Sequence, residues 1–259
     1  MKAVASMVTH GNILADIGTD HGYVPISLVQ RKKIPRAIAM DINKGPLQRA
    51  QEHIKEAQLE DYIETRLSDG VKKLKVGEVD SILIAGMGGE LVIHILTEGQ
   101  EICRNVKEIV LQPQSELDKV RKFLRDNKYK IVDEDMIIED GKYYPMMKVL
   151  PVDEDTFWDM VPQEAVPACY KYGPLLLKNG NPSLRKFLVR QHKQLTTILK
   201  QLEKQPESEA IAHRKKEVLD EIYKVSERFP FENFSELYDY LDNNRVQLPD
   251  IYQSFKEKA

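Results

Sequence analysis

The sequence predicts a doubly wound α/β domain, in which a parallel sheet is closed by an antiparallel hairpin, followed by a helical hairpin. Three observations support this prediction. Short apolar runs alternate with segments of helical periodicity between residues 12 and 124. Two β-rich runs joined by Asp140-Gly141 then have the pattern of a β-hairpin. Finally, two long segments with apolar residues at helical spacing follow a proline-rich stretch.

Each apolar run in the first half of the chain ends at glycine, proline or aspartate, which is typical of strands bounded by turns. The expected strands are 13–17, 37–42, 63–69, 80–87 and 108–113, and the expected helices are 22–32, 44–59, 89–96 and 117–124. Strand and helix are thus expected to alternate five times. The expected hairpin consists of 129–139 and 143–152.

The rest of the chain has a different character. Residues 153–181 are irregular and rich in proline, and we interpret them as a linker packed along the first domain. Two segments with helical spacing lie on either side of Pro206, which predicts an antiparallel helical hairpin with a coiled-coil-like seam. The aromatic-rich residues 230–259 are compatible with a further helix or two. The expected helices are 184–202 and 211–229, and the expected domains are 1–155, the linker 156–182, and the helical domain 183–259.

Composition narrows the class of protein. The 259 residues are 42% hydrophobic, and the formal net charge of −3 gives no bulk attraction to nucleic acid, so any such surface must be local. Cys103 and Cys169 match no metal-binding spacing, which indicates a reducing compartment. No apolar run reaches the ~20 residues that span a bilayer, and the N-terminus is too polar for a signal peptide. We expect a cytoplasmic protein with no metal and no membrane partner, and a monomer is the favoured state.

The turn after the first strand indicates the kind of ligand. It consists of Gly18-Thr19-Asp20-His21-Gly22, and Asp16 precedes it. A dinucleotide site needs G-x-G-x-x-G, because the pyrophosphate lies on bare backbone at the helix N-terminus. Here Asp20 replaces the middle glycine, so two carboxylates would repel a pyrophosphate. The same carboxylates suit the sulfonium and α-ammonium groups of S-adenosylmethionine (SAM), which is therefore favoured over NAD.

Aspartates end the first three strands, at Asp16, Asp41 and Asp69. The C-terminal ends of parallel strands converge on one crevice. Asp41 is placed to accept both ribose hydroxyls of the cofactor, and Asp69 to accept from its adenine amine near the Gly70 backbone. The N–H groups of the helix that starts at Gly22 would bind the methionine carboxylate. The alternative is that turns simply favour aspartate, which is the weaker explanation for three successive strands.

The fourth strand ends in Gly86-Met87-Gly88-Gly89, where a methyl acceptor would enter. Methyltransferases that act on exocyclic amines commonly carry an [N/D]-P-P-[F/Y] loop here, and this sequence has none. A ring nitrogen of adenine has a free lone pair and needs less help with deprotonation, which suits a glycine loop. Two structural alternatives stay open. The glycines could serve to close a turn and nothing more, and His21 could serve to cap its own turn and nothing more.

Positive charge gathers between residues 178 and 204, which contain seven Lys or Arg and one carboxylate, Glu203. Such a local excess on an acidic chain is typical of phosphate contacts, although a solvated helix face is an alternative of about equal weight. We expect nucleic acid to contact Lys178, Arg185, Lys186, Arg190, Lys193 and Lys200.

The segments ADIGTDHGYVP, AMDIN, SDG, IAGMGG and LQPQSELDKVRKFL, followed by a helical hairpin, closely resemble the bacterial tRNA (adenine-N1)-methyltransferases of the TrmK family. The resemblance covers about residues 3–228 and implies a class I SAM-dependent, Rossmann-like methyltransferase fold with a C-terminal coiled coil that helps hold tRNA. It implies methyl transfer to ring nitrogen 1 of adenine 22 in tRNA, with no strong general base and no catalytic residue assigned.

The residues expected at the cofactor are Asp16, Gly18, Thr19, Asp20, His21, Gly22, Asp41, Ile42, Asp69, Gly70 and Gly86, and those beside the acceptor base are Gly86, Met87, Gly88 and Gly89. Two other functions stay open at this stage. One is SAM-dependent methylation of a small molecule or a protein, for which the basic helix would be incidental. The other is a SAM-binding RNA adaptor without turnover.

Overall fold

The computed structural model describes residues 2–152, 155–206 and 208–226. The chain divides into two compact units, Met1–Leu176 and Leu177–Ala259. The predicted aromatic-rich segment 230–259 lies outside the described residues. The domain boundaries at 155 and 182 that we inferred from the sequence stay a prediction.

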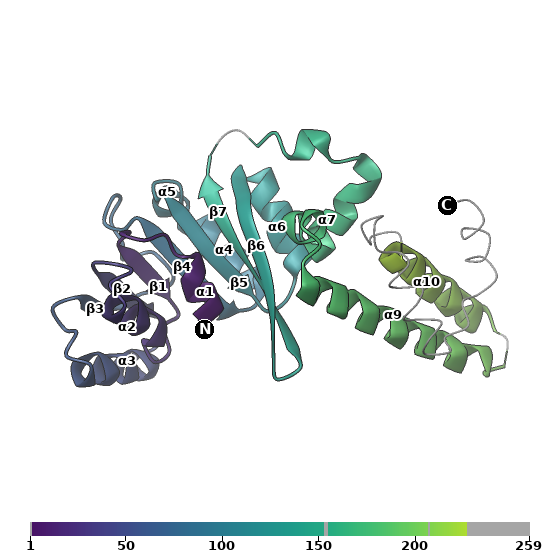
Figure 1. The fold of residues 1–259 in the computed structure, drawn as a ribbon, viewed down its shortest axis with the longest axis horizontal. Helices are drawn as coiled ribbons and strands as arrows, with labels where there is room; N and C mark the ends of the chain where they lie inside the picture. Colours follow the sequence, from purple (N-terminus) through teal and green to yellow (C-terminus); the bar gives the residue numbers. More distant parts are fainter. Residues whose placement is uncertain (1, 153–154, 207, 227–259) are drawn as a thin grey trace. The chain divides into compact units, whose positions relative to one another are not determined.

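A seven-stranded sheet forms the centre of the first unit (Figure 1). Its strands are β1 (Leu14–Ile17), β2 (Ala37–Asp41), β3 (Ile63–Leu67), β4 (Ser81–Met87), β5 (Glu108–Pro113), β6 (Tyr129–Glu139) and β7 (Lys142–Pro151). The order is β3-β2-β1-β4-β5-β7-β6. Strands β1 to β5 are parallel, whereas β7 pairs antiparallel with both β5 and β6. The predicted sheet with a terminal antiparallel hairpin is confirmed.

Helices cover both faces of the sheet. They are α1 (Lys2–Met7), α2 (Tyr23–Gln30), α3 (Lys44–Glu56), α4 (Gly89–Glu98), α5 (Gln100–Cys103) and α6 (Leu117–Asp126). Alternate residues along each strand point to opposite faces, so Ile82 and Ile84 of β4 pack with α4, α5 and α6, while Leu83 packs with α1, α2 and α3. None of the described helices is long and apolar enough to cross a membrane.

The sequence predicts no helix between its third and fourth strands, and the structure agrees. Residues 68–80, between β3 and β4, form turns and no helix. Helix α5 was not expected, because four residues are too few to show a helical period. The β6–β7 turn is as predicted: Asp140 and Gly141 have φ values of 50° and 72°, the left-handed pair that a type I′ turn requires.

A buried ion pair fixes β6 to the segment that follows the sheet. Arg121 Nε lies 2.8 Å from Glu134 Oε1, and the two side chains are 1% and 0% exposed. Arg121 also donates to the Tyr170 carbonyl, and Glu134 Oε2 accepts from Leu175 N. Backbone partners thus satisfy both buried charges. The stretch that we expected to be irregular contains η1 (Trp158–Met160), η2 (Gln163–Ala165), α7 (Val166–Tyr172) and α8 (Pro174–Lys178).

The second unit contains helices α9 (Pro182–Glu203) and α10 (Glu209–Ser226). Asn181 caps α9, since its Oδ1 accepts from Ser183 N and Leu184 N. Helix α10 returns alongside α9 (Figure 1), and the two share a seam of buried apolar side chains: Leu199, Leu202, Val218 and Ile222. The predicted helical hairpin is present, and its coiled-coil packing stays a prediction.

Candidate active site

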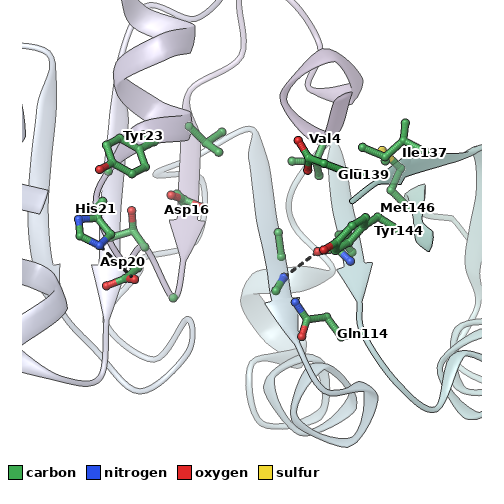
Figure 2. A pocket seen from close by; sticks show the side chains of 17 residues that line it. Val4, Asp16, Asp20, His21, Tyr23, Gln114, Ile137, Glu139, Tyr144 and Met146 are labelled. Carbon is green, nitrogen blue, oxygen red and sulfur yellow. Dashed lines mark hydrogen bonds and ion pairs between the residues drawn. The ribbon is translucent and has the colours of Figure 1, made fainter. Parts of the chain in front are cut away.

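A cavity of about 380 Å³ opens at the C-terminal ends of β1, β4 and β5, a size typical of small-molecule sites. Figure 2 shows two walls that face each other across it. The first wall, from β1 and the turn after it, contains Asp16, Gly18, Thr19, Asp20, His21 and Gly22. The second wall comes from β4, β5 and the β6–β7 hairpin and contains Gly86, Gln112, Gln114, Ile137, Glu139 and Tyr144.

Asp16 places a buried carboxylate in the first wall. It lies on β1, between β2 and β4, and is 7% exposed. Burial raises the pKa of Asp16 to about 6, and the neighbouring Asp41 carboxylate adds to this effect. A cation that binds beside such a carboxylate stabilises its ionised form, because the attraction compensates for the hydration that the carboxylate loses on folding.

Gly18 and Gly22 shape the turn after β1. Both have positive φ, 75° and 69°, which favours glycine. A Cβ on Gly18 would lie 2.1 Å from Met87 Cε, so the Met87 side chain packs directly over the turn. The turn is therefore covered from the β4 side, and any larger residue at Gly18 would displace Met87.

Three aromatic rings lie side by side at the rim of the first wall. The ring centroids of His21 and Tyr23 are 5.1 Å apart, and each lies 5.3 Å from that of His53, with interplanar angles of 7° to 19°. His53 Nδ1 also lies 2.9 Å from the His21 carbonyl oxygen. Next to this group, Asp20 is paired with Arg49, whose hydrogen bond lowers the pKa of the carboxyl. These contacts hold the His21 side chain at the cavity (Figure 2).

Gln112 contributes a buried amide to the second wall. It lies on β5 and is 8% exposed, and its Oε1 accepts a hydrogen bond from Gly86 N at 3.0 Å. The other end of the amide, Nε2, is buried and has no partner among the described residues. Buried polar atoms in native structures nearly always have a partner, so a donor left over in a cavity wall indicates a ligand.

The structure gathers only part of the predicted cofactor set into this cavity. Asp16, Gly18, Thr19, Asp20, His21, Gly22 and Gly86 line it. Asp41 and Ile42 lie beyond its lining at the end of β2, where Asp41 Oδ1 accepts from Asn43 N at 2.7 Å and Ile42 is 60% exposed. Asp69 and Gly70 border a separate, shallow depression at the end of β3, where Asp69 is paired with Lys72 at 2.7 Å.

Three of the predicted acceptor-loop residues serve other contacts. Met87 covers Gly18, Gly88 precedes α4, and Gly89 N donates to Ser115 Oγ at 3.2 Å. Only Gly86 of this loop lines the cavity. Within the described part of the chain, no three His, Cys, Asp or Glu side chains gather in a way that could hold a metal ion.

Apart from Gly86, the sequence analysis missed the second wall. Gln112 and Gln114 follow the apolar part of β5, so the argument used for Asp16 and Asp41 at strand ends applied to them as well. Glu139 and Tyr144 gave no such signal, since their position depends on β7 pairing with β5.

Basic side chains form a stripe along α9. Lys186, Arg190, Lys193 and Lys200 are exposed and recur at intervals of four, three and seven residues, which places them on one face of the helix. We call these four residues the α9 stripe. Of the other predicted cations, Arg185 is partly buried and Lys178 is exposed at the end of α8.

Comparison with known proteins assigns the family. A model described as "Methyltransferase domain" matches residues 1–147. The tRNA (adenine(22)-N(1))-methyltransferase of Bacillus subtilis is 31% identical over 227 residues, which cover 88% of this chain and 94% of that protein. The chain belongs to the tRNA (adenine(22)-N(1))-methyltransferase family. This confirms the family and the Rossmann-like methyltransferase fold expected from the sequence.

Two solved structures agree with this chain in fold. B. subtilis TrmK matches with a TM-score of 0.75 at 31% identity, covering 88% of this chain and 97% of that one. Streptococcus pneumoniae Sp1610, solved in complex with S-adenosyl-L-methionine, matches with a TM-score of 0.74 at 31% identity and the same coverage. The matched length extends beyond the methyltransferase domain and includes part of the helical unit, because 88% of 259 residues exceeds the 176 residues of the first unit.

Proposed function

We propose that the protein transfers a methyl group from SAM to ring nitrogen 1 of adenine 22 in tRNA. The observation that carries the proposal is the cavity, which has a buried carboxylate and a glycine turn on one wall, and two amides, the Glu139 carboxylate and an aromatic ring on the other. Such walls suit a cationic donor beside a flat, uncharged acceptor. The relatives named above supply the identity of the donor and of the acceptor base.

The residues of the first wall fit SAM. Asp16 would lie beside its positive charges, and the backbone N–H groups at the start of α2, after Gly22, would bind its carboxylate. When bound, SAM supplies an electrophilic methyl group. Because N1 of adenine carries no proton at neutral pH, the residues of the cavity need to position the base rather than remove a proton. The base must leave its stack in the folded tRNA to reach them.

The pH dependence of SAM affinity tests the role of Asp16. Since burial raises the pKa of Asp16 to about 6, we expect the free protein to hold a proton there below that pH. Binding of a cation must then expel the proton, so the dissociation constant should rise by up to about tenfold for each pH unit below about 6. Calorimetric titration between about pH 5 and about pH 8 measures this.

Asp16→Asn provides the control for this experiment. It keeps the size of the side chain and removes the titrating carboxylate, so its weaker affinity should lack the loss below about pH 6 that Asp16 causes. The same pKa predicts an effect on stability. Because the pKa of Asp16 is higher in the folded than in the unfolded protein, the folded protein loses stability as the pH rises through about 6. Ionised Asp16 therefore costs on the order of 2–3 kcal/mol at neutral pH, and the unliganded Asn variant should melt at a higher temperature. An affinity of the unmodified protein that stays constant across the range would contradict the assignment.

A labelling experiment tests the function as a whole. The full chain is incubated with methyl-labelled SAM and unmodified total tRNA, and the tRNA is then digested to nucleosides. We expect label in 1-methyladenosine, and none in transcripts whose position 22 is changed to another base. SAM binding without labelled nucleoside would favour the RNA adaptor, and label in protein or small molecules would favour another methyltransferase activity.

We also propose that tRNA is the macromolecular partner, that the protein is cytoplasmic and that it acts as a monomer. Light scattering of the purified chain with and without tRNA measures the oligomeric state directly.

A further inference from the structure

We propose that Gln112 and Glu139 form a recognition site for the N6/N7 edge of the acceptor adenine, against which Tyr144 packs its ring. In this arrangement Gln112 donates to N7, Glu139 accepts from the N6 amine, and N1 stays free to accept the methyl group. The inference rests on the proposed function and adds to it the residues that select adenine.

The orientation of the Gln112 amide follows from its neighbour. Gly86 N is a hydrogen-bond donor, so the atom of Gln112 that lies 3.0 Å away must be the oxygen. Nε2 therefore points away from Gly86, and it is buried without a partner in the described structure. Since Gln112 lines the cavity, this fixed donor requires an acceptor atom on the ligand.

The position of Gln112 in the sheet selects the acceptor base over SAM. In the strand order β1-β4-β5, Gln112 lies two strands away from Asp16, about 10 Å across the sheet. The first wall holds Asp16, which suits the positive charge of SAM, whereas Gln112 lies on β5, the strand that leads to Gln114 on the opposite wall (Figure 2). We therefore place the acceptor over β4 and β5.

The chemistry of adenine indicates which ring nitrogen accepts the hydrogen bond from Gln112 Nε2. Adenine has three ring acceptors, N1, N3 and N7, and a donor to N1 would occupy the lone pair that must attack the methyl group. N7 lies beside the N6 amine, and proteins recognise adenine most often by donating to N7 and accepting from N6. Gln112 cannot make both contacts, because its oxygen is held by Gly86. A second side chain must accept from N6.

Glu139 is placed to be that acceptor. Ile137 pairs with Tyr144 across the β6–β7 hairpin, and Glu139 lies two residues beyond Ile137, so the three side chains share one face of the hairpin. All three line the cavity, and Figure 2 shows Glu139 and Tyr144 on the wall opposite Asp16. A tyrosine ring at this position offers a surface on which a displaced base can stack.

The charge that develops during transfer gives Glu139 a second role. The N1 lone pair forms the new C–N bond while the C–S bond breaks, and the bonding pair stays on sulfur. The donor thereby becomes a neutral thioether, and one positive charge moves to the adenine ring. A carboxylate hydrogen-bonded to N6 stabilises this cation more than the neutral substrate, which accelerates the reaction. The same carboxylate repels O6 of guanine.

Exchange of single atoms in the substrate tests the Gln112 contact. We compare tRNA containing adenine at position 22 with tRNA containing 7-deazaadenine, which lacks the N7 acceptor. The unmodified protein should lose about tenfold in kcat/KM on the analogue. Gln112→Glu keeps an oxygen for Gly86 and removes the donor, so it should be about tenfold slower on adenine and show no further loss on 7-deazaadenine. If Gln112→Glu still loses a full tenfold in kcat/KM on 7-deazaadenine, Gln112 does not donate to N7.

Glu139 is tested with purine at position 22, which lacks the N6 amine. We expect Glu139→Gln to lower kcat by about tenfold on adenine and to reduce the penalty that the unmodified protein shows on purine. Asp133→Asn is the matched control, since Asp133 is exposed on the same strand and outside the cavity lining. An unchanged purine penalty in Glu139→Gln would exclude Glu139 as the N6 acceptor.

Two controls separate this inference from the function on which it rests. SAM affinity should be the same in Glu139→Gln and the unmodified protein, and a cooperative thermal transition of Gln112→Glu shows that this variant is folded. If the unmodified protein does not methylate adenine 22 at all, the proposed function fails. If it does, and the variants keep the full analogue penalties, only the recognition site fails.

Discussion

Asp41→Ala is expected to raise the dissociation constant for SAM by at least about a hundredfold. The carboxylate lies at the C-terminal end of β2, where its Oδ1 is fixed by the backbone N–H of Asn43 at 2.7 Å. Its Oδ2 accepts no hydrogen bond from the residues that the structure describes. Two hydrogen bonds from ribose hydroxyls to this carboxylate would contribute about 1.5–3 kcal/mol each. Calorimetric titration with SAM measures the loss.

Two further variants show whether the loss belongs to the ribose contact. Asp41→Asn keeps an oxygen for Asn43 N but lacks the charge, so its affinity should lie between those of the alanine variant and the unmodified protein. Asp61→Ala removes an exposed carboxylate that lines neither depression, and it should bind SAM normally. If Asp41→Ala binds SAM as tightly as Asp61→Ala, Asp41 is a strand-end residue without a part in binding.

The first wall of the site could be predicted because its information is local. A strand, a glycine turn and a helix follow one another in the sequence from Leu14 to Gln30, and the positive φ values of Gly18 and Gly22 agree with the glycines found there. The charge of Asp16 and its neighbours then indicated a cationic ligand before any geometry was known. The Asp140-Gly141 hairpin was predicted for the same reason, since the turn type depends on two adjacent residues.

The part of the second wall that the hairpin contributes could not be predicted, because it depends on pairing between distant segments. Tyr144 reaches the cavity only because β7 pairs with β5, with Leu111 opposite Met147. Nothing in the local pattern of either strand specifies this register. The orientation of the Gln112 amide likewise depends on Gly86, on a different strand.

The three strand-end aspartates illustrate a different limit of prediction from the sequence. The sequence places Asp16, Asp41 and Asp69 at the same edge of the sheet, and the structure agrees, but the order β3-β2-β1 spreads them over about 10 Å. A compact cavity at β1 therefore contains only Asp16. An elongated ligand, with its methionine end at β1, its ribose at β2 and its adenine at β3, would contact all three, which is the arrangement that the Asp41 experiment tests.

Reversing the charge of Lys186, Arg190 and Lys193 to Glu is expected to weaken tRNA binding by about a hundredfold or more at low salt. These residues belong to the α9 stripe, on a helix of 22 residues that is about 33 Å long. Each contact between a cation and a phosphate releases counterions, so affinity falls with salt in proportion to the number of contacts. Losing three contacts should reduce the slope of log K against log salt by about two to three. Gel shifts at several salt concentrations measure both quantities.

The salt slope decides between a phosphate contact and a general effect of charge. Reversing Lys55, Lys73 and Lys75 changes the net charge by the same amount on exposed parts of the first unit. This control should lower tRNA affinity only slightly and leave the slope unchanged, because long-range repulsion is screened within about 10 Å at moderate salt. Both triple variants should bind SAM normally. If the two variants behave alike toward tRNA, the α9 stripe is a solvated helix face, and the phosphate contacts must lie on another surface.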